Sequence, residues 1–146
     1  MKIKPEEYRQ MQKEAAPHSK SYLNIPMAFL VGGLICVIGQ LLLEGYGTLG
    51  LEKDAAAAWT SVTLVSLSAL LTGFGVYERL AKHAGAGTLV PITGFANAIS
   101  SSAIEAKTEG FILGVGAKIF TIAGPVILYG CAASVVYGIV YYFFLQ

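Results

Sequence analysis

The chain has 146 residues, of which 55% are hydrophobic and 13% charged, with a formal net charge of +1. Ordinary soluble domains carry about 25% charged residues, so this composition argues against a soluble monomer. The basic residues form no dense cluster with interleaved aromatic side chains, which argues against a nucleic-acid partner.

Four long runs of the sequence carry no charged side chain. They cover residues 26–43, 55–77, 85–104 and 119–146. A helix needs about 20 apolar residues to cross a bilayer, and at least three of the runs reach that length. The sequence therefore predicts an all-α integral membrane protein with three to four transmembrane helices plus re-entrant or broken helical segments. Cys36 and Cys131, each within an apolar run, are predicted to be small buried side chains without a disulfide or a metal.

Residues 1–24 form a charged arm, which we predict to be cytoplasmic and distinct from a transmembrane, channel-like domain over residues 25–146. The prolines at positions 5 and 17 favour a short helix over residues 6–16. No secretory signal peptide is expected here. The arm is either a solvated tail or a segment that lies on the membrane or docks on a partner.

The first span is predicted over residues 25–43, and Glu44 with the glycines after it predicts the end of that helix. Small residues inside a span allow close helix packing in lipid. Such residues here are Gly32, Gly33 and Gly39. The second span is predicted over residues 56–77 and is rich in Ser and Thr. These hydroxyls either bond back to their own helix or form a wet face toward a pore. Residues 78–84 are predicted to form a short charged loop.

The run at residues 88–104 is uncharged but contains Pro91, Gly94 and Asn97, followed by three serines. Irregular backbone at membrane depth is tolerated only inside protein or beside water, so we predict a buried, broken or re-entrant segment. The alternative is an ordinary third span of low hydrophobicity.

Residues 111–123 look like a half-length helix that contains Lys118, ended by a break at Gly124–Pro125. Residues 125–145 are then long enough to span. Five of the ten Lys and Arg residues lie in the amino-terminal arm, and two lie in the loop after the second span. This bias predicts a cytoplasmic amino terminus. The carboxy-terminal orientation depends on whether residues 88–104 cross.

No Ser/His/Asp arrangement or phosphate-binding glycine loop is present, so neither an enzyme nor a cofactor site is expected. Broken helices in membranes often mark a solute path. The candidate lining residues of a polar conduit are Asn97, Ser100, Ser101, Ser102, Lys118 and Glu105. Two alternatives stay open: Lys118 snorkels to the interface, and Glu105 belongs to a solvated loop rather than to a cation-attracting pore mouth.

Two strings carry a family resemblance. AFLVGGLICVIGQ at residues 28–40 resembles the first span of the stage V sporulation protein AC family. LLTGFGVYERLAKHAGAGTLVPITGFANAISSSAIEAKTEGFILGVG at residues 70–116 resembles the family's central block. The resemblance covers nearly all of the chain, except the loop at residues 44–54.

The resemblance implies a membrane channel subunit for dipicolinic acid with calcium, located in the inner membrane of the forespore and spore. Such a channel takes up the solute in sporulation, releases it in germination and responds to membrane tension. The implied partners are an AE-type membrane protein and a soluble, dipicolinate-binding AD-type protein. The alternative function is a non-conducting membrane scaffold that anchors the soluble partner. The resemblance implies no catalytic residues.

Overall fold

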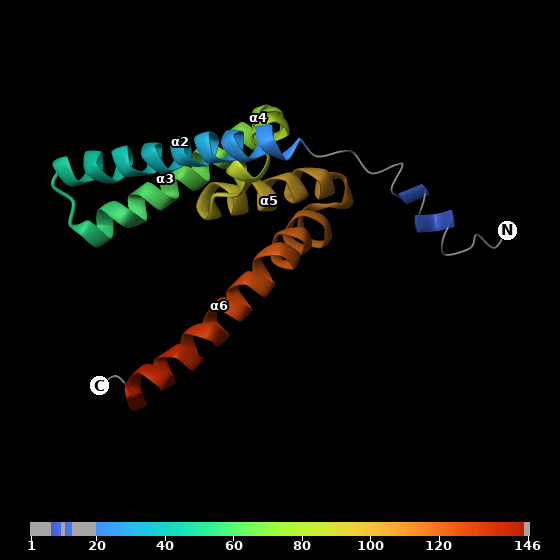
Figure 1. Cartoon of the computed structure of the whole chain (residues 1–146). Coiled ribbons are helices and arrows are strands. Elements are labelled where there is room, and N and C mark those ends of the chain that lie inside the picture. Colours follow the sequence, from blue (N-terminus) through green and yellow to red (C-terminus); the bar gives the residue numbers. More distant parts are fainter. Residues whose placement is uncertain (1–6, 10, 13–19, 145–146) are drawn as a thin grey trace.

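The computed structural model describes residues 7–9, 11–12 and 20–144, and every regular element in these residues is helical. Figure 1 shows α2 (Ser21–Thr48) and α3 (Lys53–Gly73) as two long helices that run in opposite directions, with α5 beside them. Most of the predicted amino-terminal helix over residues 6–16 lies outside the described residues; residues 7–9 and 11–12 are helical.

Three helical stretches of the described chain are long and apolar enough to cross a membrane: Ser21–Thr48, Lys53–Gly73 and Phe111–Phe144. The predicted all-α membrane architecture is therefore confirmed, with three candidate spans. Large apolar side chains are exposed along all three. In a bilayer, such side chains contact lipid or neighbouring helices.

The helix α2 is longer than predicted because Gly45 and Gly47 do not end it. It continues to Thr48 and ends where Gly50 adopts a φ of +86°, with the Leu51 amide donating to the carbonyl oxygen of Tyr46. A left-handed residue closes a helix in this way, and glycine adopts that conformation without a steric penalty.

Residues 78–84 form a helix rather than the predicted charged loop. The helix α3 ends at Gly73, and Gly75, with a φ of +69°, turns the chain into α4 (Val76–Ala84). Tyr77 and Ala84 on α4 are buried against the rest of the molecule. The prediction was wrong because these residues form a short amphipathic helix, in which Tyr77 and Ala84 pack on the bundle and the charged side chains stay exposed.

After α4, the short 3-10 helix η1 (Gly85–Leu89) packs against α2, and α5 (Pro91–Glu105) follows. The helix α5 is continuous, so the predicted break between Pro91 and Ser102 is absent. Pro91 occupies the first turn of α5, where a missing amide proton is not costly. With 15 residues, α5 is about 22 Å long, shorter than the ~30 Å hydrocarbon core.

Two hydrogen bonds set the register of α5 on α3. Ser68 Oγ donates to the Thr93 carbonyl oxygen at 2.7 Å. Thr72 Oγ1 lies 2.8 Å from Asn97 Oδ1 and 2.7 Å from the Ser68 carbonyl oxygen, so its one proton is shared between these two acceptors. From the first pair to the second, the residue number rises by four in both helices, so α5 runs parallel to α3. It therefore starts beside the middle of the bundle and returns to the side at which α3 ends. The length and direction of α5 agree with the predicted re-entrant segment, and α5 is not among the helices long enough to cross a membrane.

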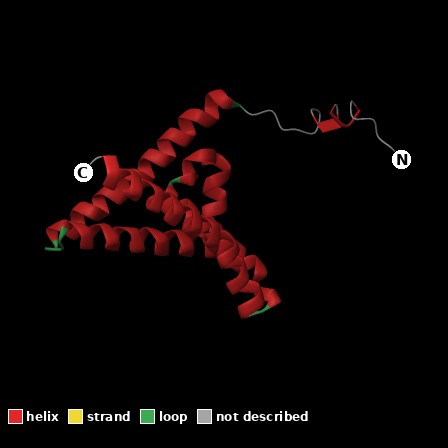
Figure 2. Ribbon diagram, turned by 90° about the horizontal axis from the view of Figure 1, so that it is seen from below, coloured by secondary structure: helices red, strands yellow, loops and turns green. Residues whose placement is uncertain are grey.

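The chain then passes through η2 (Ala106–Glu109) and the π-helix η3 (Phe111–Gly116) into α6 (Ala117–Phe144). The predicted break at Gly124–Pro125 is wrong, because α6 runs through both residues. Neighbouring helices, waters and small local adjustments make proline tolerable inside transmembrane helices. In Figure 1, α6 leaves the α2–α5 unit near the end of α5 and extends away from it. Figure 2, seen from below, shows that the described chain consists of helices joined by short loops.

Little of the described chain is buried, and what is buried consists mostly of small or hydroxyl-bearing residues. They are Ala56, Thr60, Leu64, Ser68, Tyr77, Ala84, Gly87, Thr88, Thr93, Ala96, Ala106 and Gly114. Small residues permit close helix contacts in lipid. As predicted, Gly32 and Gly39 lie at such contacts, with η1 and Leu64, whereas Gly33 faces open space. Cys36 and Cys131 form no disulfide, as predicted, but they are exposed rather than buried.

Candidate functional site

The candidate site lies where α3, α4 and α5 meet. A cavity of about 470 Å³ opens there. Its lining consists of Thr72, Gly75, Glu78, Ala81, Asn97, Ser101, Ile104 and Glu105. Small-molecule sites have volumes of about 300–1,000 Å³, so this cavity has room for a small solute.

Three of the residues predicted for a polar conduit, Asn97, Ser101 and Glu105, line this cavity. Asn97 is half-buried, whereas Ser101 and Glu105 are exposed. Ser101 Oγ donates to the Ala98 carbonyl oxygen at 3.2 Å, so the α5 backbone already satisfies this hydroxyl. The Asn97 side chain accepts from Thr72 and also borders the cavity, which makes this pair its inner wall.

Three predicted residues meet at a second, smaller cavity of about 130 Å³. Its lining consists of Ser102, Glu105, Ala106, Glu109 and Lys118. Glu105 lines both cavities and therefore lies between Asn97 on one side and Lys118 on the other. Ser100 is half-buried and lines neither of these two cavities.

The electrostatic surroundings of Lys118 differ from those its sequence position suggests. The sequence places Lys118 alone within an apolar stretch, but the fold places its exposed side chain in a cavity with Glu105 and Glu109. Two carboxylates and one ammonium give the smaller cavity a formal charge of −1. A mouth of this charge attracts cations and does not favour a free dianion.

The junction between η2 and η3 brings these charged residues together. Gly110, with a φ of +97°, reverses the chain, and Gly114 then packs against the carbonyl oxygen of Ala106 so closely that a side chain has no room. Glycine is therefore required at position 114. This contact fixes the start of η3, and through it Lys118, beside the end of α5.

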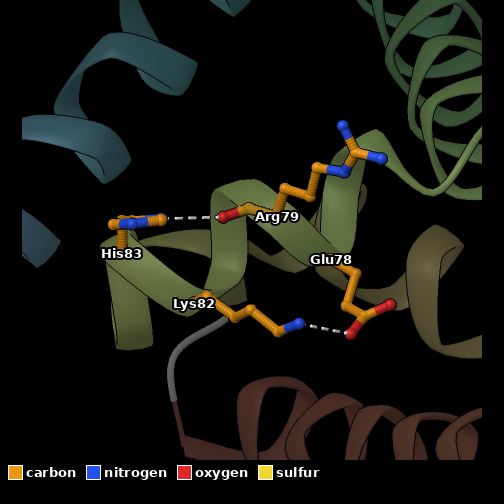
Figure 3. A network of polar contacts seen from close by, with 4 residues as sticks. All are labelled: Glu78, Arg79, Lys82 and His83. Atoms are coloured by element: carbon orange, nitrogen blue, oxygen red, sulfur yellow. Dashed lines mark hydrogen bonds and ion pairs between the residues drawn. The ribbon is translucent and has the colours of Figure 1, made fainter.

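Glu78 and Ala81 are the α4 residues that line the larger cavity. Lys82 Nζ lies 3.0 Å from Glu78 Oε1, and His83 Nδ1 lies 3.0 Å from the carbonyl oxygen of Arg79 (Figure 3). The Glu78–Lys82 pair is largely exposed, so it contributes little to stability.

The hydroxyls of α3 are mostly satisfied locally. Thr60, Ser61 and Thr63 each donate to the carbonyl oxygen four residues earlier. Of the two alternatives for this helix, back-bonding therefore describes these residues. Ser68 is different because its buried hydroxyl bonds to α5.

Sequence reasoning missed Glu78 and Tyr77 as parts of this region, and it included Thr72 only among the hydroxyls of the second span. Tyr77 is 3% exposed, and its hydroxyl donates to the Thr88 carbonyl oxygen at 2.8 Å, which ties α4 to η1. The four-residue spacing of Ser68 and Thr72 was a usable signal, because it places both hydroxyls on one face of α3. Within the described residues, no group of three or more His, Cys, Asp or Glu side chains could hold a metal ion.

Comparison with known proteins gives two matches. A family model described as SpoVAC/SpoVAEB sporulation membrane protein matches residues 24–140. The chain is also 44% identical over 140 residues to Stage V sporulation protein AC of Bacillus subtilis (strain 168), covering 95% of this chain and 93% of that protein. No solved structure matches this chain.

Proposed function

The chain belongs to the SpoVAC/SpoVAEB family of sporulation membrane proteins, and from this premise we propose that it is a subunit of a passive channel for dipicolinic acid. The channel works in the inner membrane of the forespore and spore, with uptake in sporulation and release in germination. Its role is conduction rather than catalysis, and it opens under membrane tension or on contact with a partner.

The observation that carries the proposal is the 470 Å³ cavity beside the half-length helix α5. Because α5 runs parallel to α3 and begins beside Ser68, its amino terminus lies within the bundle. Half-helices that end at membrane depth present unpaired backbone groups to solutes in many transporters. The polar side chains around the cavity offer a small solute an entrance next to such a helix.

The charge of the cavities favours calcium dipicolinate over free dipicolinate as the solute. Glu105 borders both cavities, and Glu109 joins it in the smaller one. Dipicolinate is a dianion, so its one-to-one complex with calcium is neutral and is not repelled by these carboxylates. Calcium also prefers oxygen ligands, and the carboxylates attract it toward the entrance.

We further propose that the amino terminus is cytoplasmic, which in the spore is the core side. The starts of α2 and α6 and the end of α5 share one side of the bundle, whereas the α2–α3 connection lies on the other. Residues 49–52, which connect α2 to α3, contain no Lys or Arg, and Lys53 follows as the first residue of α3. This strong bias supports the orientation by the positive-inside rule. The carboxy terminus then faces the opposite side.

The proposed partners are an AE-type membrane protein and a soluble AD-type protein that binds dipicolinate. Every residue from 125 to 144 on α6 is exposed in this single chain, and Gly130, Ser134 and Gly138 share one face of the helix. Small residues with this spacing suit close packing against another transmembrane helix. This surface supports a contact with the membrane partner.

The test uses purified full-length protein in liposomes loaded with calcium dipicolinate. Terbium outside the liposomes luminesces when it chelates released dipicolinate, and a drop in external osmolarity applies tension. We expect release that grows with tension and is absent from protein-free liposomes. Glu105→Gln slows release by up to about ten-fold at low ionic strength and less at high salt. Glu52→Gln is the matched control, since this exposed acid lies at the other end of α3.

The second candidate function is a non-conducting scaffold for the soluble partner. The observation in its favour is that Ser68 and Thr72 of α3 bond directly to α5. Direct bonds of this kind leave no water between the two helices at these residues. A variant in which Cys36 and Cys131 are replaced by Ala and Asn97 by Cys separates the two functions. Reaction of the Asn97→Cys thiol with an aqueous reagent, faster under tension, supports the channel. If this thiol stays unreactive and the liposomes stay silent even with the AE-type protein added, the channel proposal fails.

A further inference from the structure

The helix α4 leaves one side uncovered, and this side has an apolar strip. Successive residues of an α-helix are turned by about 100°, so Val76 and Leu80 lie next to one another around the helix. Their side chains are 47% and 40% exposed, whereas Tyr77 and Ala84 on the adjoining side are 3% and 1% exposed. The packed side holds α4 on the bundle and Val76 faces outward, whereas Leu80, at the rim of the packed side, also borders a small apolar cavity with Ile35 and Ile38 of α2.

A basic strip borders this apolar strip. Arg79 and His83 occupy the helix positions directly beside Val76 and Leu80. Figure 3 shows the Arg79 guanidinium on the opposite side of α4 from the Glu78–Lys82 pair. Among the residues that the structure describes, no carboxylate lies within ion-pair distance of Arg79. Its charge is therefore available to an outside group.

The position of α4 places these two strips at the edge of the membrane. The membrane-crossing helix α3 ends at Gly73, only three residues before α4 begins, and the intervening Phe74 is 78% exposed. A short amphipathic helix at this position lies in the interface, with its apolar strip toward the acyl chains and its basic strip among the headgroups. The unpaired guanidinium complements a phosphate, which it can bind through two parallel hydrogen bonds.

We propose that α4 is an interfacial anchor that binds an anionic phospholipid, with Arg79 on the lipid phosphate and Val76 and Leu80 against the acyl chains. Glu78 and Ala81 on the other side of the same helix line the 470 Å³ cavity. A lipid that moves α4 therefore also changes the width of that cavity. The binding itself does not depend on the proposed channel function.

The experiment uses the full-length protein with Cys36→Ala, Cys131→Ala and Val76→Cys, labelled at position 76 with a small fluorophore. The labelled protein is placed in vesicles of equal parts phosphatidylcholine and phosphatidylglycerol. Brominated acyl chains quench the fluorophore on contact. Two vesicle preparations are compared, one with bromine on phosphatidylglycerol and one with bromine on phosphatidylcholine. We expect phosphatidylglycerol to occupy the site about five-fold more often than phosphatidylcholine.

The variant Arg79→Gln in the same background should remove this preference. Arg79→Lys should keep part of it, because lysine carries the positive charge but lacks the planar guanidinium that can bind a phosphate through two hydrogen bonds. Lys53→Gln is the matched control, since it removes one exposed basic residue at the far end of α3 and should leave the preference unchanged.

Equal quenching by the two lipids in the parent protein would overturn the proposal. Absence of quenching by either lipid would do the same, because it would place Val76 in water or against protein. A preference that persists in Arg79→Gln would show that the bound lipid is not held by this residue. Each readout is obtained from vesicles at rest, so a failure here is distinct from a failure of conduction.

Discussion

Replacing Gly87 by Ala should separate η1 from α2, because the two backbones touch at this residue. A Cβ at position 87 would lie 2.5 Å from the carbonyl oxygen of Ala28 and 2.9 Å from its Cα. Ordinary van der Waals contact begins at 3.4 Å, so the two segments must part by about 0.9 Å. The atoms in the way belong to the α2 backbone and cannot swing aside as a side chain would. Overpacking of this kind costs about 1–3 kcal/mol.

The measurement is the midpoint of thermal unfolding in a single detergent at a fixed heating rate. For a chain of this length, the cost corresponds to a midpoint lowered by about 3–10 °C. The matched control is Gly33→Ala on α2, where a Cβ meets nothing within 4 Å and alanine favours the helix. That variant should unfold at the parent temperature or slightly above it. An unchanged midpoint for Gly87→Ala would refute the close approach of η1 to α2.

Two further substitutions test the hydrogen bonds that hold the re-entrant unit. Tyr77→Phe removes the donor to the buried Thr88 carbonyl oxygen and should cost about 1–2 kcal/mol, seen as a lowered unfolding midpoint; a midpoint equal to the parent's would contradict the bond. Thr72→Val removes the hydroxyl that Asn97 and the Ser68 carbonyl oxygen share and should cost about 0.6–1.7 kcal/mol. Thr121→Val, whose hydroxyl bonds only to a carbonyl oxygen within α6, should cost less; equal losses would argue against an α3–α5 link.

The membrane spans follow from composition alone, and the structure confirms them. A bilayer accepts long apolar helices and little else, so uncharged runs of sufficient length leave few alternatives. The ends of the helices were harder to predict. The sequence suggested ends at Glu44 and Pro125, yet α2 continues to Thr48 and α6 passes through Pro125. Helix-breaking propensity is weak evidence in lipid, because a broken helix there exposes backbone groups that have no water to bond with.

The sequence left two alternatives for residues 88–104, a re-entrant segment and a third span. It could not decide between them because it does not show which residues of this segment lie beside which residues of α3. Pro91 and the low hydrophobicity of the run indicated an unusual segment but not its direction. The direction is set by Ser68 and Thr72 bonding to partners 25 positions away. The tight contact of Gly87 with α2 holds the turn before α5 in place. No local periodicity encodes such pairings.

The candidate site, too, could be predicted from the sequence only in part. Residue type alone was enough to single out Asn97, Glu105 and Lys118, because polar groups are rare in this chain. The fold then placed Glu105 at the lining of two cavities and put Glu109 in the same cavity as Lys118. The sequence by itself determined a helical membrane protein of this sporulation family. Only the tertiary structure decided which side α5 returns to and which charges meet, because both depend on contacts between segments far apart in the chain.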